Sequence, residues 1–164
     1  MRALTYDDIH PLWTAKAAMD LDDAPVLVEA LGAAQPDILS YLLGTGEDIL
    51  TPEERQILFF LGILIWYVID TISDAIPQIT VKQLWENEEK NLRMLEYLDG
   101  EPEGEFMNTV TRIMDTYNQS TLLKYVIERI MEEPEKNSDI IEDHIGMMVI
   151  YLKSLIDSID AAVP

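Results

Sequence analysis

The two histidines of this chain are the first residues to test for metal or acid–base chemistry. Asp7 precedes His10 by three residues, which would place both side chains on one face of a helix, although Pro11 disturbs that turn. A di-metal centre in a helical bundle needs Glu-x-x-His pairs together with further inward-pointing carboxylates. His144 follows Ile141 at that spacing and has no carboxylate partner there. We expect no metal site and no cofactor, and we interpret both histidines as surface residues.

An acidic stretch that begins at Asp99 matches the opening of a calcium-binding loop. Asp99, Glu101 and Glu103 occupy its first, third and fifth places, and Gly104 occupies the sixth. The twelfth place, which requires a bidentate glutamate, holds Val110 instead. We therefore interpret the stretch as an acidic solvated turn.

Nucleophilic catalysis has no support in the sequence. The chain has no cysteine, no Gly-x-Ser-x-Gly turn and no glycine-rich phosphate loop. Its 31 acidic residues form many carboxylate pairs by chance, so no general acid and base can be nominated. We expect a protein that is not an enzyme. The alternative is a small-molecule or metal-dependent enzyme inside a helical bundle, with a polar cavity lined by residues such as Tyr41, Tyr67, Tyr125, Tyr151 and Trp66.

The net charge of −20 is spread evenly along the chain. Residues 1–76 carry 13 acidic and 3 basic residues, and residues 77–164 carry 18 and 8. Such a field repels phosphate backbones and anionic lipids, so we expect no nucleic-acid partner and no membrane partner. It favours a basic protein partner or cations, although acids that only keep a surface soluble are common. A further alternative is an acidic mimic of nucleic acid that occupies a basic groove.

Residues 57–69 are 13 successive residues without a charge and could be mistaken for a membrane span. The run is shorter than the ~20 residues that a bilayer core requires, and Arg55 and Asp70 flank it closely. We therefore expect a buried central helix. Residues 1–8 lack the apolar stretch of a secretory signal, and we expect a cytoplasmic protein.

Hydrophobic residues recur at helical spacing along almost the whole chain, and no segment alternates like a half-buried strand. The clearest boundary is at Thr51, which can cap a helix that has Pro52 at its first position and Glu54 returning a hydrogen bond. We expect an all-α fold of about eight helices, with a loop between the last two at residues 133–137. The helices are expected over residues 6–20, 25–33, 36–43, 52–76, 80–98, 103–117, 120–132 and 138–160.

Two halves of the chain share an order of residue types. Gly62 aligns with Gly146 at an offset of 84, and a tyrosine follows each glycine five residues later. A Leu-Trp pair also opens each half, with its tryptophan at Trp13 and at Trp85. We interpret the match as a tandem duplication of a four-helix unit, packed into one globular bundle with a pseudo-twofold axis. The repeats are expected at residues 1–76 and 77–164.

The recurring glycine predicts close packing of helices. Glycine costs about 1 kcal/mol relative to alanine inside a helix, and two helices that cross without an intervening Cβ recover that cost in contacts. We expect Gly62 and Gly146 at helix crossings, either facing each other near the pseudo-twofold axis or packing separately within each repeat.

The uncharged run of the helix expected at residues 52–76 has no polar side. Leu58, Phe59 and Phe60 stand where the second repeat has the polar residues 142–144. A helix that is apolar on every side must be enclosed, either by the other helices or by a partner. We expect a non-catalytic protein that acts through protein–protein interaction, as an adaptor or regulatory subunit, with a basic partner or as a homodimer. The candidate interaction residues are three apolar anchors and five steering acids: Leu58, Phe59, Phe60, Glu53, Glu54, Glu132, Glu133 and Glu135.

Overall fold

Residues 1–19, 24–137 and 140–164 are described by a computed structural model of the chain. Over this part the protein is all-helical, with eight α-helices and no strand, as the sequence predicts. A 3₁₀ turn at Glu142–His144 leads directly into the last helix. The helices are α1 (Tyr6–Ala17), α2 (Ala24–Ala34), α3 (Pro36–Gly44), α4 (Pro52–Ile72), α5 (Val81–Asp99), α6 (Glu103–Thr116), α7 (Ser120–Asn137) and α8 (Ile145–Ala162).

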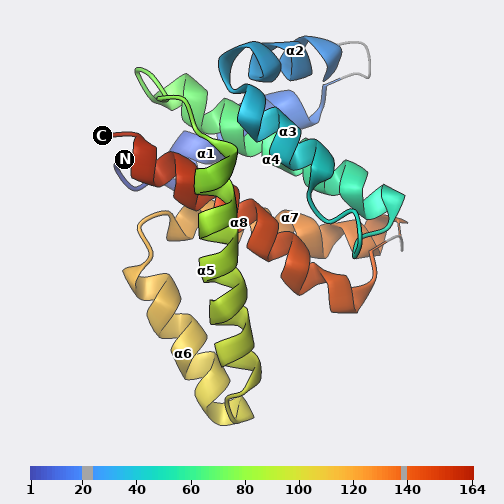
Figure 1. Cartoon of the computed structure of the whole chain (residues 1–164), viewed down its shortest axis with the longest axis vertical. Coiled ribbons are helices and arrows are strands. Elements are labelled where there is room, and N and C mark those ends of the chain that lie inside the picture. Colours follow the sequence, from blue (N-terminus) through green and yellow to red (C-terminus); the bar gives the residue numbers. More distant parts are fainter. Residues whose placement is uncertain (20–23, 138–139) are drawn as a thin grey trace.

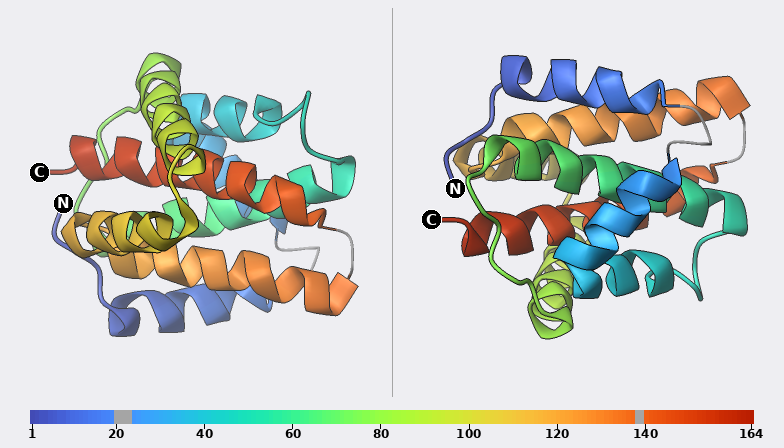
Figure 2. Two further views of the ribbon diagram at one scale, coloured as in Figure 1. Left: turned by 90° about the horizontal axis from the view of Figure 1, so that it is seen from below. Right: turned by 90° about the horizontal axis from the view of Figure 1, so that it is seen from above.

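The long helices α4 and α8 contact each other at the centre of the bundle (Figure 1). α4 also packs on α1, α2 and α3, and α8 also packs on α5 and α7. α1 and α7 lie side by side on one face of the molecule (Figure 2). α5 and α6 pair as an arm that projects from the bundle (Figure 1), so that the outer part of α5 is left with α6 as its neighbour.

The core is built around α4 and α8, whose middle turns are buried on every side. In α4 every residue from 61 to 66 is buried, and in α8 every residue from 150 to 156 is buried. A helix without a solvent-facing side must be enclosed by other elements, and α1, α2, α3 and α8 enclose α4. The prediction of a buried central helix is therefore confirmed. By length and composition alone α4 could also cross a membrane, a property that core helices of soluble proteins share.

Gly62 lies at a close helix crossing, and Gly146 does not. A Cβ at residue 62 would lie 2.8 Å from Cδ1 of Leu42 in α3 and still closer to its Cδ2. α3 and α4 can approach this closely only because residue 62 has no side chain. A Cβ at residue 146 would meet no atom within 4 Å. The prediction is confirmed for Gly62 and wrong for Gly146, and the two glycines do not face each other.

Local signals set the start of α4 but not the end of α7. Thr51 Oγ1 accepts a hydrogen bond from the Glu54 amide at 3.2 Å, and the Glu54 side chain bonds the Thr51 amide, as predicted. α4 ends at Ile72, about one turn before the predicted end. α7 continues through Pro134 to Asn137, so the loop predicted there is wrong. Pro134 removes one helical hydrogen bond, the one to the carbonyl of residue 130, and the helix continues past it.

α8 begins at Ile145, later than the predicted start at residue 138, which lies outside the described residues. The reason is a contact with α4. Ile141 is extended, with φ −75° and ψ 126°, and its amide donates to Glu54 Oε1 at 2.8 Å. An extended residue cannot continue a helix, so the helix starts only after the 3₁₀ turn that follows.

The two predicted repeats have the same pattern of helix contacts. The first and fourth helices of each repeat pack together, as α1 on α4 and α5 on α8, and the second and third do so as α2 on α3 and α6 on α7. The first helix of each repeat also contacts the third helix of the other. These contacts fit a tandem duplication, which stays a prediction together with its boundaries. The two tryptophans that open the repeats lie in different environments, since Trp13 is 2% exposed and Trp85 is 63% exposed.

Candidate functional site

The three predicted apolar anchors lie in different environments on α4. Leu58 is completely buried, so its prediction as an exposed anchor is wrong. It shares a helix face with Leu61 and Ile65, at the i, i+3 and i+7 spacing that points into the core. Phe59 is half-buried and packs against the core, while Phe60 is 36% exposed. Phe59 also lines a surface hollow of about 260 Å³ with Leu42, Leu43, Pro52, Arg55 and Gln56.

Glu54 is a buried structural carboxylate, so its prediction as a steering charge is wrong. Its Oε2 accepts from the Thr51 amide at 2.9 Å and lies 2.8 Å from Nδ1 of His144. Its Oε1 accepts from the Ile141 amide at 2.8 Å. Burial by itself raises the pKa of a carboxyl group, but the hydrogen bonds from Ile141, Thr51 and His144 outweigh burial and lower the pKa of Glu54. This side chain therefore joins the start of α4 to the segment before α8.

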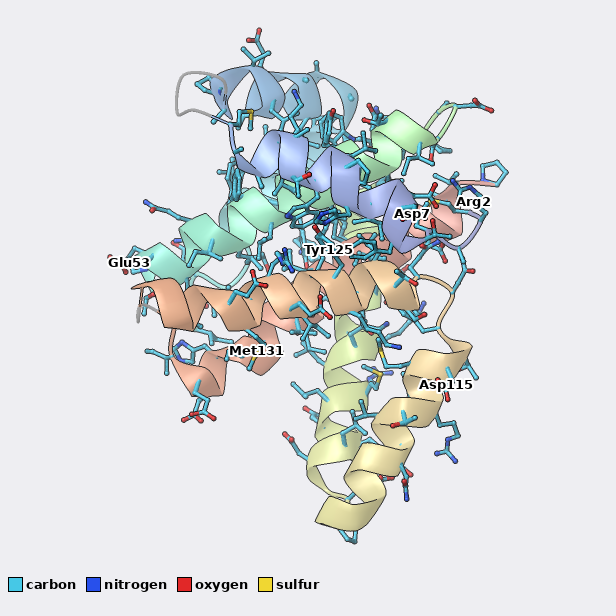
Figure 3. The ribbon with its side chains drawn as sticks, turned by 180° about the vertical axis from the view of Figure 1, so that it is seen from behind. Arg2, Asp7, Glu53, Asp115, Tyr125 and Met131 are labelled. Atoms are coloured by element: carbon cyan, nitrogen blue, oxygen red, sulfur yellow. The ribbon has the colours of Figure 1, made fainter. Side chains whose placement is uncertain are left out.

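The other predicted steering acids lie near the same end of the molecule. Glu53 is exposed in the first turn of α4, at the same end of the molecule as the C-terminal end of α7 (Figure 3). Glu132 is half-buried and pairs with Arg129, with 3.1 Å between Oε1 and Nη2. The side chains of Glu133 and Glu135, in the last turns of α7, lie outside the part that the structure describes. Of the described acids in this group, only Glu53 is exposed.

A pocket of about 450 Å³ lies between α3, the loop that joins α3 to α4, and the first turns of α5. Val81, Trp85 and Glu88 line it from α5, at the i, i+4 and i+7 spacing of one helix face. Glu47 and Asp48 line it from the loop and are exposed. The remaining wall includes Ser40, Tyr41, Thr45, Gly46, Ile49 and Tyr151. The sequence did not predict this pocket.

A buried tyrosine fixes one carboxylate of the pocket. The Tyr41 hydroxyl donates to Oε2 of Glu88 at 2.7 Å, and Tyr41 is 4% exposed. Burial and the Glu88 carboxylate both raise the pKa of Tyr41, so this phenol stays protonated and remains a donor. Burial, Glu88 and Asp48 likewise raise the pKa of Tyr151. For both phenols burial is the largest cause of the raised pKa, and the negative charge of the pocket adds to it.

A glycine turn holds the loop against α8. Gly46 has φ 75°, a conformation that residues with a side chain rarely adopt. Its carbonyl accepts from the amides of Ile49 at 3.1 Å and Leu50 at 2.8 Å. A Cβ at residue 46 would lie 3.2 Å from the ring of Tyr151 and closer to Leu50. The glycine therefore allows the loop to pack closely and keeps the two acids that follow it at the rim.

Trp85 supplies an exposed aromatic face to the pocket. The other two tryptophans, Trp13 and Trp66, are 2% and 3% exposed. α5 buries only a narrow stripe that includes Leu84 and Asn91, and Trp85 lies about 100° around the helix from Leu84. The sequence pattern indicates Trp85 only as a marker of the second repeat. The charged residues around it on α5 were the signal that could have identified it as exposed.

The pocket combines three carboxylates, an indole face and hydroxyl groups. Its lining residues, all within the described part of the chain, include no histidine, cysteine or lysine. The described residues also contain no group of three or more His, Cys, Asp or Glu side chains placed to hold a metal ion. Such a set of groups suits the binding of an organic cation, by charge and by contact with the aromatic face.

The five aromatic residues of the enzyme alternative do not converge on one cavity. Tyr41 and Tyr151 line the pocket. Tyr125 of α7 faces α1 (Figure 3), where its hydroxyl is 2.9 Å from Nδ1 of His10. Trp66 is enclosed in the core, and Tyr67 is half-buried on α4. The cavity that this alternative requires is therefore formed by two of the five residues at most.

A second polar cluster lies buried between α5 and α8. Lys153 Nζ donates to Asn91 Oδ1 at 2.9 Å and to Asp157 Oδ2 at 2.7 Å, and it lies 4.5 Å from the ring centre of Tyr117. The Tyr117 hydroxyl donates to the other Asp157 oxygen at 2.6 Å. Asn91 also donates to Ser154 at 3.1 Å. Because these groups satisfy one another, the cluster is a structural network that binds the arm to α8.

No family model, curated protein or solved structure matches the chain. The fold, the charge and the acidic pocket are therefore the observations on which a proposal of function rests.

Proposed function

We propose that this protein is a non-catalytic interaction protein, an adaptor or regulatory subunit, that binds a basic protein partner. The observation that supports this most is the placement of exposed Trp85 beside Glu47, Asp48 and Glu88 in one pocket. Tryptophan is among the residues that most often dominate protein–protein binding energy, and polar residues form the usual rim around such an anchor. The pocket is thus the proposed centre of the interface.

The charge of the whole chain supports the same kind of partner. A net charge of −20 attracts a basic surface over a distance of about a Debye length and raises the rate of encounter. Electrostatic attraction of this kind contributes more to association rate and specificity than to raw affinity. The same field opposes nucleic acid and anionic lipid, so neither is a proposed partner.

The proposal is tested with a fluorescein-labelled nona-arginine peptide as the basic probe and a nona-serine peptide as the neutral control. Fluorescence anisotropy at about 150 mM NaCl should show binding of the basic peptide only, weakening as salt rises. Self-association through the smaller hollow beside Phe59 is a separate question. It is answered by light scattering, which measures whether the protein in solution has the molar mass of a monomer or of a dimer.

Matched charge variants separate the pocket from the general acidity. A triple variant without the pocket charges should bind nona-arginine about tenfold or more weakly, because no carboxylate then remains in the lining of the pocket. It combines Glu47→Gln, Asp48→Asn and Glu88→Gln. The control combines Glu29→Gln, Glu96→Gln and Asp115→Asn, which are exposed acids outside the pocket. It should change affinity less than about twofold. Equal losses in both variants, or no binding by the wild type, would refute the proposal.

A further inference from the structure

We infer that the pocket receives an arginine side chain of the basic partner, with its guanidinium stacked on Trp85 and paired with the Glu88 carboxylate. This inference rests on the proposed function and names the side chain that the pocket recognises. It follows from three features of the described residues: an aromatic face without an internal cation, a carboxylate held in place, and acids on the opposite wall.

Trp85 differs from three of the seven tyrosines of this chain in its lack of an internal cation. Lys16, Arg129 and Lys153 lie over the rings of three tyrosines, at 5.1, 4.7 and 4.5 Å from the ring centres. Within the described part of the chain no such cation covers Trp85, which keeps most of its surface exposed. An indole binds a cation more strongly than a phenol ring does. The best cation-binding ring on the surface is therefore open to a group from another molecule.

Glu88 lies one turn after Trp85 on the same face of α5. The Tyr41 hydroxyl, at 2.7 Å, holds Oε2 of this carboxylate and uses one of about four lone-pair positions. Both oxygens can therefore still accept from a forked donor. Because the carboxylate is already ordered by a buried tyrosine, less side-chain entropy is lost when it binds.

The geometry favours arginine over lysine. A guanidinium is planar, can stack on an indole, and presents paired N–H groups that match the two oxygens of a carboxylate. An ammonium group is compact and more strongly hydrated, and it cannot use both surfaces at once. Glu47 and Asp48 on the facing loop add negative charge to the opposite wall. A pocket of about 450 Å³ is also large enough to admit the side chain with its aliphatic stem.

The test compares nona-arginine with nona-lysine, which carry the same charge, on the 164-residue chain. Binding is followed by anisotropy and by acrylamide quenching of tryptophan fluorescence. Because Trp13 and Trp66 are almost completely buried, quenching reports mainly on Trp85. Nona-arginine should bind about fivefold or more tightly than nona-lysine and should protect Trp85 from acrylamide.

Substitutions at the ring show whether stacking is the cause. Trp85→Leu keeps an apolar side chain but removes the aromatic face, so the preference for arginine should disappear. Trp85→Phe keeps an aromatic face and should retain part of that preference. Glu88→Gln should lower the affinity for nona-arginine more than that for nona-lysine, and Glu96→Gln on the same helix should alter neither. Thermal melting of each variant checks that the fold is intact, and the quenching measurement on the wild type needs no variant.

Three outcomes would overturn the inference. Equal affinity for the two peptides without protection of Trp85 would reject the arginine site and leave the proposed basic partner standing. Absence of binding by either peptide would reject both. Equal protection of Trp85 by free spermidine, at a concentration matched in charge, would identify a site for small amines instead of one for a protein side chain.

Discussion

Glu54 connects two segments of the core that lie far apart in the sequence. A buried carboxylate is tolerated when hydrogen bonds replace its lost hydration, and Glu54 obtains them from Thr51, Ile141 and His144. The Thr51 contact is local and was predicted from the capping pattern. The other two span 87 and 90 residues, and no local pattern indicates them. A residue that looks like a surface charge by composition is thus a structural centre.

Replacement of Glu54 by glutamine should lower the free energy of unfolding by about 1–3 kcal/mol near pH 7. The reason is that the backbone amide of either Thr51 or Ile141 would then face the NH₂ group of the glutamine instead of an oxygen. Folding lowers the pKa of Glu54. Its contribution is therefore complete above the unfolded pKa, about 4.3, and is lost as the pH falls through the lower folded value. The difference between wild type and Glu54→Gln should shrink below about pH 4.

Urea unfolding between about pH 3 and pH 7 measures this difference, with Glu53→Gln as the control. Glu53 is adjacent but exposed, so its replacement should change stability by less than about 0.5 kcal/mol. A difference that is constant across the range would show that the ionised form of Glu54 has no special role.

At the scale of helices, α4 and α8 have similar apolar sequences but different neighbours. α4 is held close to α3 at Gly62, where Leu42 fills the space that a side chain would need. α8 makes its main contact with α5, which adds the buried polar network around Lys153. The shared Gly-and-Tyr pattern therefore does not produce the same packing. A Cβ at residue 146 in the first turn of α8 would point into open space, so glycine is not required there.

Alanine substitutions should distinguish the two glycines by the sign of their effect. Gly62→Ala should destabilise by about 1 kcal/mol net, because overpacking against Leu42 costs about 1–3 kcal/mol and improved helix propensity offsets up to about 1. Gly146→Ala should stabilise by about 0.5 kcal/mol, since the site has room and alanine is the better helix former. Melting temperatures of the two variants measure this, and a stabilised Gly62→Ala variant would contradict the close crossing.

The helices were predictable where their signals are local. The start of α4 follows from Thr51 and Pro52, and the burial of its middle follows from an apolar run that has no polar side. The start of α8 was not predictable, because the Ile141 amide is bound by a side chain of α4. The pocket was not predictable for the same reason: α3, its following loop, α5 and α8 form it together. Periodicity identifies which residues face a core but not which segments meet at a surface.

The charge of the whole molecule acts on folding and on binding in opposite directions. The chain has 31 acidic and 11 basic residues, and its halves are equally acidic, so the negative charges repel one another in the folded state. Salt shortens the Debye length from about 30 Å at 0.01 M to about 8 Å at 0.15 M, and so weakens this repulsion. The same screening weakens attraction to a basic partner. The two effects can therefore be separated by measuring stability and affinity over one salt series.

The melting temperature should rise by several degrees between about 10 and 500 mM NaCl, while the affinity for nona-arginine should fall over the same range. A loss of binding caused by unfolding would show both quantities falling together. The variant with Glu29→Gln, Glu96→Gln and Asp115→Asn has three fewer negative charges, and its net charge is −17 against −20. Its melting temperature should depend less on salt than that of the wild type. A melting temperature that does not respond to salt in either protein would mean that local ion pairs already compensate the acidic surface, and that a long-range field does not attract the partner.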